Sequence, residues 1–141
     1  MGLELPPVVP PGGVYVPAVR TGSYIYTSGQ LPLVDGEPAV TGRVGADVSL
    51  DDAKQAARIC ALNALAAVGS LVDIDEVKRI VKVLGFVNSD PDFSSQTQVV
   101  NGASELFGAV FGEAGQHARS AIGVAALPLG APVEVEIVVE V

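Results

Sequence analysis

The last nine residues of the chain alternate strictly between two kinds of position. Positions 133, 135, 137, 139 and 141 carry valine or isoleucine, whereas positions 134, 136 and 140 carry glutamate and position 138 carries valine. Successive side chains of a β-strand point to opposite faces of a sheet, so a period of two indicates a strand. The pattern predicts a half-buried strand over 133–141, and a fold for this chain has to bury one face of a sheet.

A second β-rich run, Arg119–Leu127, precedes this strand, and the short Pro/Gly-rich loop 128–132 lies between them. The layout predicts two strands joined by a loop. If these strands pair, Arg119 lies near Glu134 or Glu136, which strand parity places on the same face. Two interpretations remain open: a structural ion pair on a sheet face, or an anion-binding arginine beside an acid or base.

Further strands are expected earlier in the chain, at 14–20, 24–30, 40–44 and 77–88. The first two are separated by Thr21, Gly22 and Ser23, a combination that predicts a hairpin. Pro17 places the first of them at a sheet edge or a bulge, because proline cannot donate to a strand ladder. A Gly/Pro-rich connection is expected over 31–37.

Two helices are expected between the strands. Ser49 followed by Asp52 is a helix N-cap pattern, and small apolar residues at i, i+3 and i+4 continue to Gly69, the expected end. A second helix is expected to begin around Phe93–Ser95 and to end at Gly112. Cys60 lies within the apolar stripe of the first helix and is interpreted as a packed thiol rather than a nucleophile.

These elements predict one α+β domain over residues 1–141, with both helices on one face of the sheet and an extended proline-rich arm over 1–13. Apolar residues make up 49% of the chain, and the mean hydropathy is +0.45. No apolar run approaches the 18 residues that would cross a membrane. The apolar excess instead suggests surface buried against other subunits.

Charge and motifs exclude several classes of function. The net charge is −8 and the eight basic residues are scattered, which opposes binding to nucleic-acid phosphates. A lone cysteine fits a reducing, cytoplasmic setting, and one His with one Cys cannot form a metal cage. No phosphate-binding glycine loop or other common catalytic motif is present, and His117 is expected to be a solvated or capping residue.

A small polar set remains as candidate site residues: Tyr15, Ser28, Gln30, Asn101, Arg119, Glu134 and Glu136. Residue chemistry by itself leads to a small oligomeric α+β domain with one anion site. Two segments carry more information. They are Tyr24-Ile25-Tyr26-Thr27-Ser28-Gly29-Gln30-Leu31-Pro32, and Arg119-Ser120-Ala121-Ile122-Gly123-Val124-Ala125-Ala126-Leu127-Pro128 with Val133-Glu134-Val135-Glu136.

Both segments resemble signatures of the RidA/YjgF reactive-intermediate deaminase family, historically also called endoribonuclease L-PSP, and the resemblance covers residues 11–141. It implies a chorismate-mutase-like (bacillus type) βαβ sandwich that forms a homotrimer around a central barrel, with ligand clefts between subunits. The implied reaction is hydrolysis of an enamine or imine, such as 2-aminoacrylate, to a 2-keto acid and ammonia. No metal or organic cofactor is implied.

Site roles follow from the same resemblance. Arg119 matches the arginine that holds the substrate carboxylate, and Glu134 matches the glutamate that positions or activates water. Tyr15, Ser28 and Asn101 match pocket-lining residues, with Tyr15 and Ser28 expected from the adjacent chain. Whether Glu134 or Glu136 faces the cleft stays open.

The chain departs from active relatives at two positions. Ala121 stands where many of them have cysteine, so only its backbone could contribute to binding, and Gly123 stands where those relatives have an acid. These departures leave one alternative to deamination, a non-catalytic sensor or chaperone-like trimer that binds a small carboxylate. The historical family name suggests another, an RNA-cleaving or translation-inhibiting protein, which the charge opposes.

Overall fold

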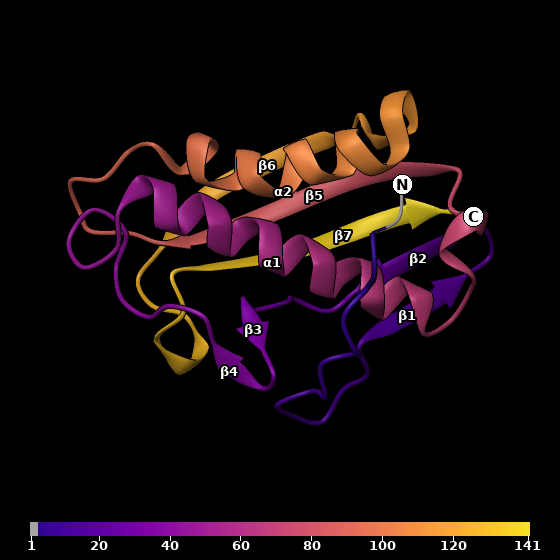
Figure 1. Ribbon diagram of the computed structural model, residues 1–141, viewed down its shortest axis with the longest axis horizontal. Coiled ribbons are helices and arrows are strands. Elements are labelled where there is room, and N and C mark those ends of the chain that lie inside the picture. Colours follow the sequence, from indigo (N-terminus) through magenta and orange to yellow (C-terminus); the bar gives the residue numbers. More distant parts are fainter. Residues whose placement is uncertain (1–2) are drawn as a thin grey trace.

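The structure is a computed structural model that describes residues 3–141; residues 1 and 2 of the expected arm lie outside the described residues. A five-stranded mixed sheet has the order β1-β2-β7-β5-β6, and a separate two-stranded sheet pairs β3 with β4. Figure 1 shows α1 and α2 side by side on one face of the large sheet, as expected. The elements are β1 (Ala18–Thr21), β2 (Tyr24–Thr27), β3 (Leu33–Val34), β4 (Glu37–Pro38), α1 (Leu50–Gly69), β5 (Arg79–Asn88), α2 (Gln96–Phe111), β6 (Ala118–Val124) and β7 (Val133–Glu140), with short 3-10 turns at Ile74–Glu76, Gly112–Gly115 and Pro128–Gly130.

Strand β7 confirms the alternation seen in the sequence. Its residues are buried and half-buried in strict succession, and Val133, Val135, Ile137 and Val139 pack beneath the helices. Glu134 and Glu136 point to the opposite face, which carries no helix in the described residues. The position of β7 between β2 and β5 explains the pattern, because a strand in mid-sheet buries one face against the helices.

The direct pairing of 119–127 with 133–141 that the short loop allowed does not occur. β5 lies between these two segments, pairing antiparallel with β7 and parallel with β6. Parallel neighbours need a crossover connection, and α2 supplies it between β5 and β6. β6 therefore lies at the edge of the sheet, and Arg119 is not a cross-strand neighbour of Glu134 or Glu136.

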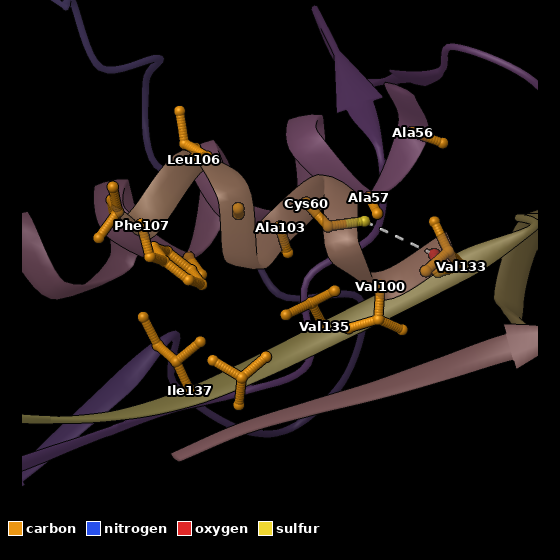
Figure 2. Packing of buried hydrophobic residues seen from close by; sticks show 14 of the residues in the cluster. Ala56, Ala57, Cys60, Val100, Ala103, Leu106, Phe107, Val133, Val135 and Ile137 are labelled. Atoms are coloured by element: carbon orange, nitrogen blue, oxygen red, sulfur yellow. Dashed lines mark hydrogen bonds between the residues drawn. The ribbon is translucent and has the colours of Figure 1, made fainter. Parts of the chain in front are cut away.

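Helix α1 begins and ends where the sequence predicts. The Ser49 hydroxyl accepts a hydrogen bond from the backbone N–H of Asp52 at 3.1 Å, and Gly69 is the last helical residue. Small side chains let the helices approach closely: a Cβ on Gly102 of α2 would overlap the backbone carbonyl of Lys54 in α1. Figure 2 shows Cys60 within this packing, with its thiol 3.6 Å from the Val133 carbonyl oxygen. Burial raises the pKa of this thiol well above its usual value, which confirms its interpretation as a packed core residue.

The N-terminal third differs from expectation in detail. The predicted hairpin exists, turning at Gly22 with φ 57°, but its strands are only four residues long. The expected strand at 40–44 is absent; Val44 makes only isolated bridges, whereas the expected connection contains the β3–β4 hairpin. Residues 3–17 have no helix or strand, and they run along α1 toward β3. No helix among the described residues is long and apolar enough to cross a membrane.

Candidate functional site

Arg119 lies on edge strand β6 and points to the face that the helices cover. Its Cα partner is Val83, whose partner on β7 is Ile137, and both of these side chains are buried against α1 and α2. Arg119 is therefore only partly exposed, where α2 lies over the edge of the sheet. Because Glu134 and Glu136 lie on the other face, one chain holds Arg119 and these glutamates apart.

Helix α2 supplies the acceptors that hold the Arg119 guanidinium. Nη1 donates to Oδ1 of Asn101 at 2.8 Å and to Oγ of Ser104 at 3.0 Å, while Nη2 donates to the carbonyl oxygen of Thr97 at 3.3 Å. Residues 97, 101 and 104 are spaced i, i+4 and i+7, so they share one face of the helix. Asn101, which the resemblance matches to a pocket-lining residue, thus contacts Arg119 directly. Thr97 and Ser104 were not anticipated, although their helical spacing from Asn101 was a usable signal.

His117 belongs to the same cluster and is half-buried; of the two expected roles, solvated or capping, the structure shows a capping contact. Its Nε2 lies 2.8 Å from Oγ of Ser104, and its Nδ1 lies 2.6 Å from the Gly115 carbonyl oxygen, which is a capping contact. Its ring meets Phe107 edge to face, with centroids 5.9 Å apart. Partial burial lowers the pKa of His117; the hydrogen bond to the Gly115 carbonyl opposes this decrease less strongly, and the Arg119 charge adds a still smaller decrease.

Glu134, which lies on the sheet face opposite to Arg119, lines a cavity of about 440 Å³. The walls come from three segments: the arm, the end of the β2 region and the loop before β7. They include Tyr15, Gly29, Gln30, Leu129 and apolar arm residues. Burial raises the pKa of Glu134, and the neighbouring Glu136 charge adds to the increase; burial alone raises the pKa of Glu136. Only Glu134 of the two lines this cavity, which favours it as the site glutamate.

Ser28 and Gln30 fix the shape of this cavity. The Ser28 hydroxyl donates to the Val16 carbonyl at 2.6 Å and its backbone N–H donates to the Pro17 carbonyl, which ties the arm beside Tyr15 to the end of β2. The Gln30 backbone exchanges two hydrogen bonds with Val135. The Ser28 hydroxyl is thus engaged inside the chain, while Tyr15 is 53% exposed.

Gly29 also shapes the site around Glu134, although nothing in the sequence singled it out. A Cβ at this position would overlap Oε1 of Glu134 and would lie 2.8 Å from its Cδ. The absence of a side chain therefore gives the Glu134 carboxylate its place against the backbone. A glycine next to the engaged Ser28 was the available signal, but its contact partner lies 105 positions later and could not be read from the sequence.

Positions 121 and 123 lie on the same face of β6 as Arg119. Ala121 is the partner of Gly85 and is partly buried, and Gly123 is the partner of Val87. A Cβ on Gly123 would approach Nε2 of Gln96 to 3.0 Å and Oγ of Ser89 to 3.2 Å, so these polar side chains occupy the space beside it. Among the described residues, no three His, Cys, Asp or Glu side chains are grouped so that they could hold a metal ion.

The fold, a mixed sheet with two helices on one face, is that of the YjgF/chorismate-mutase-like class. The chain belongs to this family: the family model described as "YjgF/chorismate_mutase-like, putative endoribonuclease" matches residues 1–141. Protein TCP17 of Trypanosoma cruzi is 46% identical over 142 residues, which cover 99% of this chain and 89% of TCP17.

Two crystal structures extend the comparison. That of protein Atu1372 from Agrobacterium tumefaciens has a TM-score of 0.91 and 45% identity, covering 99% of this chain and 86% of that one. That of TdcF from Escherichia coli, solved with bound serine, has a TM-score of 0.68 and 26% identity, covering 95% and 93% of the two chains.

Proposed function

We propose that the protein is a deaminase that hydrolyses small enamines or imines of the 2-aminoacrylate type to 2-keto acids and ammonia. The observation that carries this proposal is the guanidinium of Arg119, held by three acceptors on a sheet edge and suited to bind a carboxylate. The serine bound to TdcF supports a ligand of amino-acid size in this family. The free, buried Cys60 thiol is consistent with a cytoplasmic protein.

Glu134 is the proposed acid and base of the reaction. The enamine first takes a proton from solvent at its terminal carbon and becomes an iminium ion. Water then adds to C2 while the Glu134 carboxylate accepts a proton from it, and the same carboxyl returns that proton to the nitrogen. Ammonia leaves as the C–N bond breaks, and the hydroxyl proton passes to solvent as the keto group forms. A raised pKa makes this carboxylate a stronger base than an exposed glutamate.

The proposed site is formed by two chains. Arg119, Asn101 and the Ala121 backbone would come from the β6 edge of one protomer, and Tyr15, Ser28 and Glu134 from its neighbour. The helix-free face of the sheet is apolar enough to support a homotrimer: Val19, Tyr24, Tyr26 and Ile122 are each more than 40% exposed. Burying this face between subunits would satisfy the apolar excess of the chain.

Turnover tests the proposal directly. A pyridoxal-phosphate dehydratase that releases 2-aminoacrylate is mixed with the protein, and the rate of pyruvate formation is measured. Wild type should accelerate it, and Arg119→Ala should reduce that acceleration by about 10²-fold or more, since a charged contact to the substrate is lost. Arg58→Ala, on the exposed outer side of α1, is the matched control and should retain full activity. An Arg119→Ala protein as active as wild type would refute the assignment.

Mixed trimers test the two-chain site. Arg119→Ala and Glu134→Gln are each expected to be inactive, but unfolding and refolding them together gives interfaces that combine an intact Arg119 with an intact Glu134. Random assembly at equal amounts should restore about a quarter of wild-type activity. If both residues act within one protomer, no activity returns.

A binding module is the second candidate, and a specific feature favours it. In the row Arg119, Ala121, Gly123 on β6, only the arginine carries a polar side chain. A carboxylate could therefore bind without further chemistry from this strand. Pyruvate binding measured by calorimetry, together with no acceleration in the dehydratase assay, would establish this function instead.

RNA cleavage, named in the family description, has less support. The net charge of −8 disfavours contact with a phosphate backbone, and we expect no nucleic-acid partner. Nuclease activity that copurifies with wild type and disappears in Arg119→Ala would reverse this conclusion.

A further inference from the structure

The hydrogen bonds of Arg119 determine which part of its guanidinium is left for a ligand. An arginine has five N–H donors. Both hydrogens of Nη1 are used by Asn101 and Ser104, and one hydrogen of Nη2 by Thr97. Within the described residues, Nε–H and the second hydrogen of Nη2 remain without a hydrogen-bond acceptor. A carboxylate needs two donors for a bidentate contact, and the end of the guanidinium that combines Nη1 with Nη2 is no longer open.

The direction of each hydrogen bond in the cluster can be assigned from its chemistry. The Gly115 carbonyl can only accept, so Nδ1 of His117 carries the hydrogen in that 2.6 Å contact. The neutral imidazole then has a bare Nε2, which accepts from the Ser104 hydroxyl at 2.8 Å. With its hydrogen directed to His117, Ser104 offers its lone pair to Nη1 of Arg119.

We propose that His117 and Ser104 are positioning residues for Arg119, and that through them the guanidinium presents Nε–H and one Nη2–H to a single small carboxylate. This inference rests on the proposed function, because it assigns the same arginine a side-on contact with the substrate carboxylate. His117 acts through Ser104 and does not touch the ligand.

The physical basis is preorganisation. An arginine side chain loses considerable freedom when it is fixed, and a site that has fixed it beforehand binds more tightly. Ser104 alone could rotate its hydroxyl toward other acceptors, but the bond to Nε2 fixes the rotation. The edge contact with Phe107 and the bond to Gly115 in turn fix the imidazole.

The experiment compares variants of the whole chain by NMR and by pyruvate titration. His117 is the only histidine, so its ring nitrogen signals are assigned without ambiguity. The variants are Ser104→Ala, His117→Phe and His117→Gln; the glutamine amide oxygen can take the place of Nε2. Ser70→Ala, which removes a comparable hydroxyl bond at the end of α1, is the matched control.

We expect the wild-type ring to carry its hydrogen on Nδ1, and rotation about the Cζ–Nη1 bond of Arg119 to be slow. Ser104→Ala and His117→Phe should speed this rotation and weaken pyruvate binding roughly 3- to 10-fold, the range for freeing one side chain. His117→Gln should stay within about twofold of wild type, as should Ser70→Ala.

An Nε2–H tautomer, or an Arg119 rotation rate unchanged in both Ser104→Ala and His117→Phe, would overturn the inference. These NMR measurements need no ligand, so they decide it independently of binding. If wild type binds no pyruvate while the rotation rates change as expected, the proposed function fails and the positioning network stands.

Discussion

Replacing Gly29 by alanine should displace the Glu134 carboxyl group while changing the stability of the fold very little. The added Cβ would lie 2.8 Å from Cδ of Glu134 and would overlap its Oε1. Carbon atoms in contact are normally about 3.5–4.0 Å apart, so the carboxyl group has to move by about 1 Å. The obstructed group is the end of a flexible side chain and Gly29 has no positive φ, so we expect the free energy of unfolding to change by less than about 1 kcal/mol.

Catalysis should be much more sensitive than stability to this change. A misplacement of about 1 Å can cost about 10²-fold in rate, equivalent to about 2.7 kcal/mol of transition-state stabilisation. The assay is pyruvate formation from 2-aminoacrylate, with urea unfolding measured on the same preparations. Gly108→Ala in α2 is the control, because its Cβ would meet nothing within 4 Å and should stabilise the helix by about 0.5–1 kcal/mol without affecting turnover. A folded Gly29→Ala protein with kcat/KM within threefold of wild type would refute the role of Glu134.

Three further predictions concern stability, pH and assembly. Phe107→Ala removes a fully buried ring and should lower the free energy of unfolding by about 3–5 kcal/mol, measured by urea denaturation. Glu134 and Glu136 have raised pKa values in the folded chain, so their contribution to stability is present below the ordinary value of 4.5 and is lost as the pH rises through the folded pKa. Melting temperatures of wild type and Glu134→Gln should therefore differ in pH dependence over this window, and identical profiles would contradict the prediction. Sedimentation should give three times the chain mass of 14.3 kDa, and Tyr26→Asp should lower it by placing a charge on the helix-free face; a wild-type monomer at micromolar concentration would exclude the two-chain site.

Local structure could be predicted from the sequence better than strand pairing could. The alternation in β7, the Ser49 cap and the small-residue stripe of α1 are each written in consecutive or helically spaced residues, and each is confirmed. Pairing of β6 with β7 looked favourable because a short loop joins them. The structure instead inserts β5 between them, because β5 has an apolar face that must be buried under the helices and α2 provides the crossover that parallel pairing requires.

Site residues were harder to foresee the more their role depends on partners that are distant in the sequence. Arg119 and Glu134 follow from a family resemblance at their own positions, and their proposed roles stay predictions. The placement of His117 against Ser104 and Phe107 depends on how α2 lies over β6, which the sequence does not encode locally. The contact of Gly29 with Glu134 likewise requires the register between the β2 region and β7.

The separation of Arg119 from Glu134 on opposite faces of the sheet has a chemical consequence. Had the two strands paired as the sequence suggested, an adjacent guanidinium would have lowered the pKa of the glutamate and made it a weaker base. It would also have occupied the arginine donors that a substrate carboxylate requires. Held apart within the chain, Glu134 keeps the pKa that burial and Glu136 raise. Among the described residues Arg119 donates only to neutral acceptors, so its charge is not compensated there and two of its N–H donors are left for a ligand. A substrate that enters between two protomers brings its own carboxylate to the arginine, so the glutamate of the neighbouring chain remains available as the base.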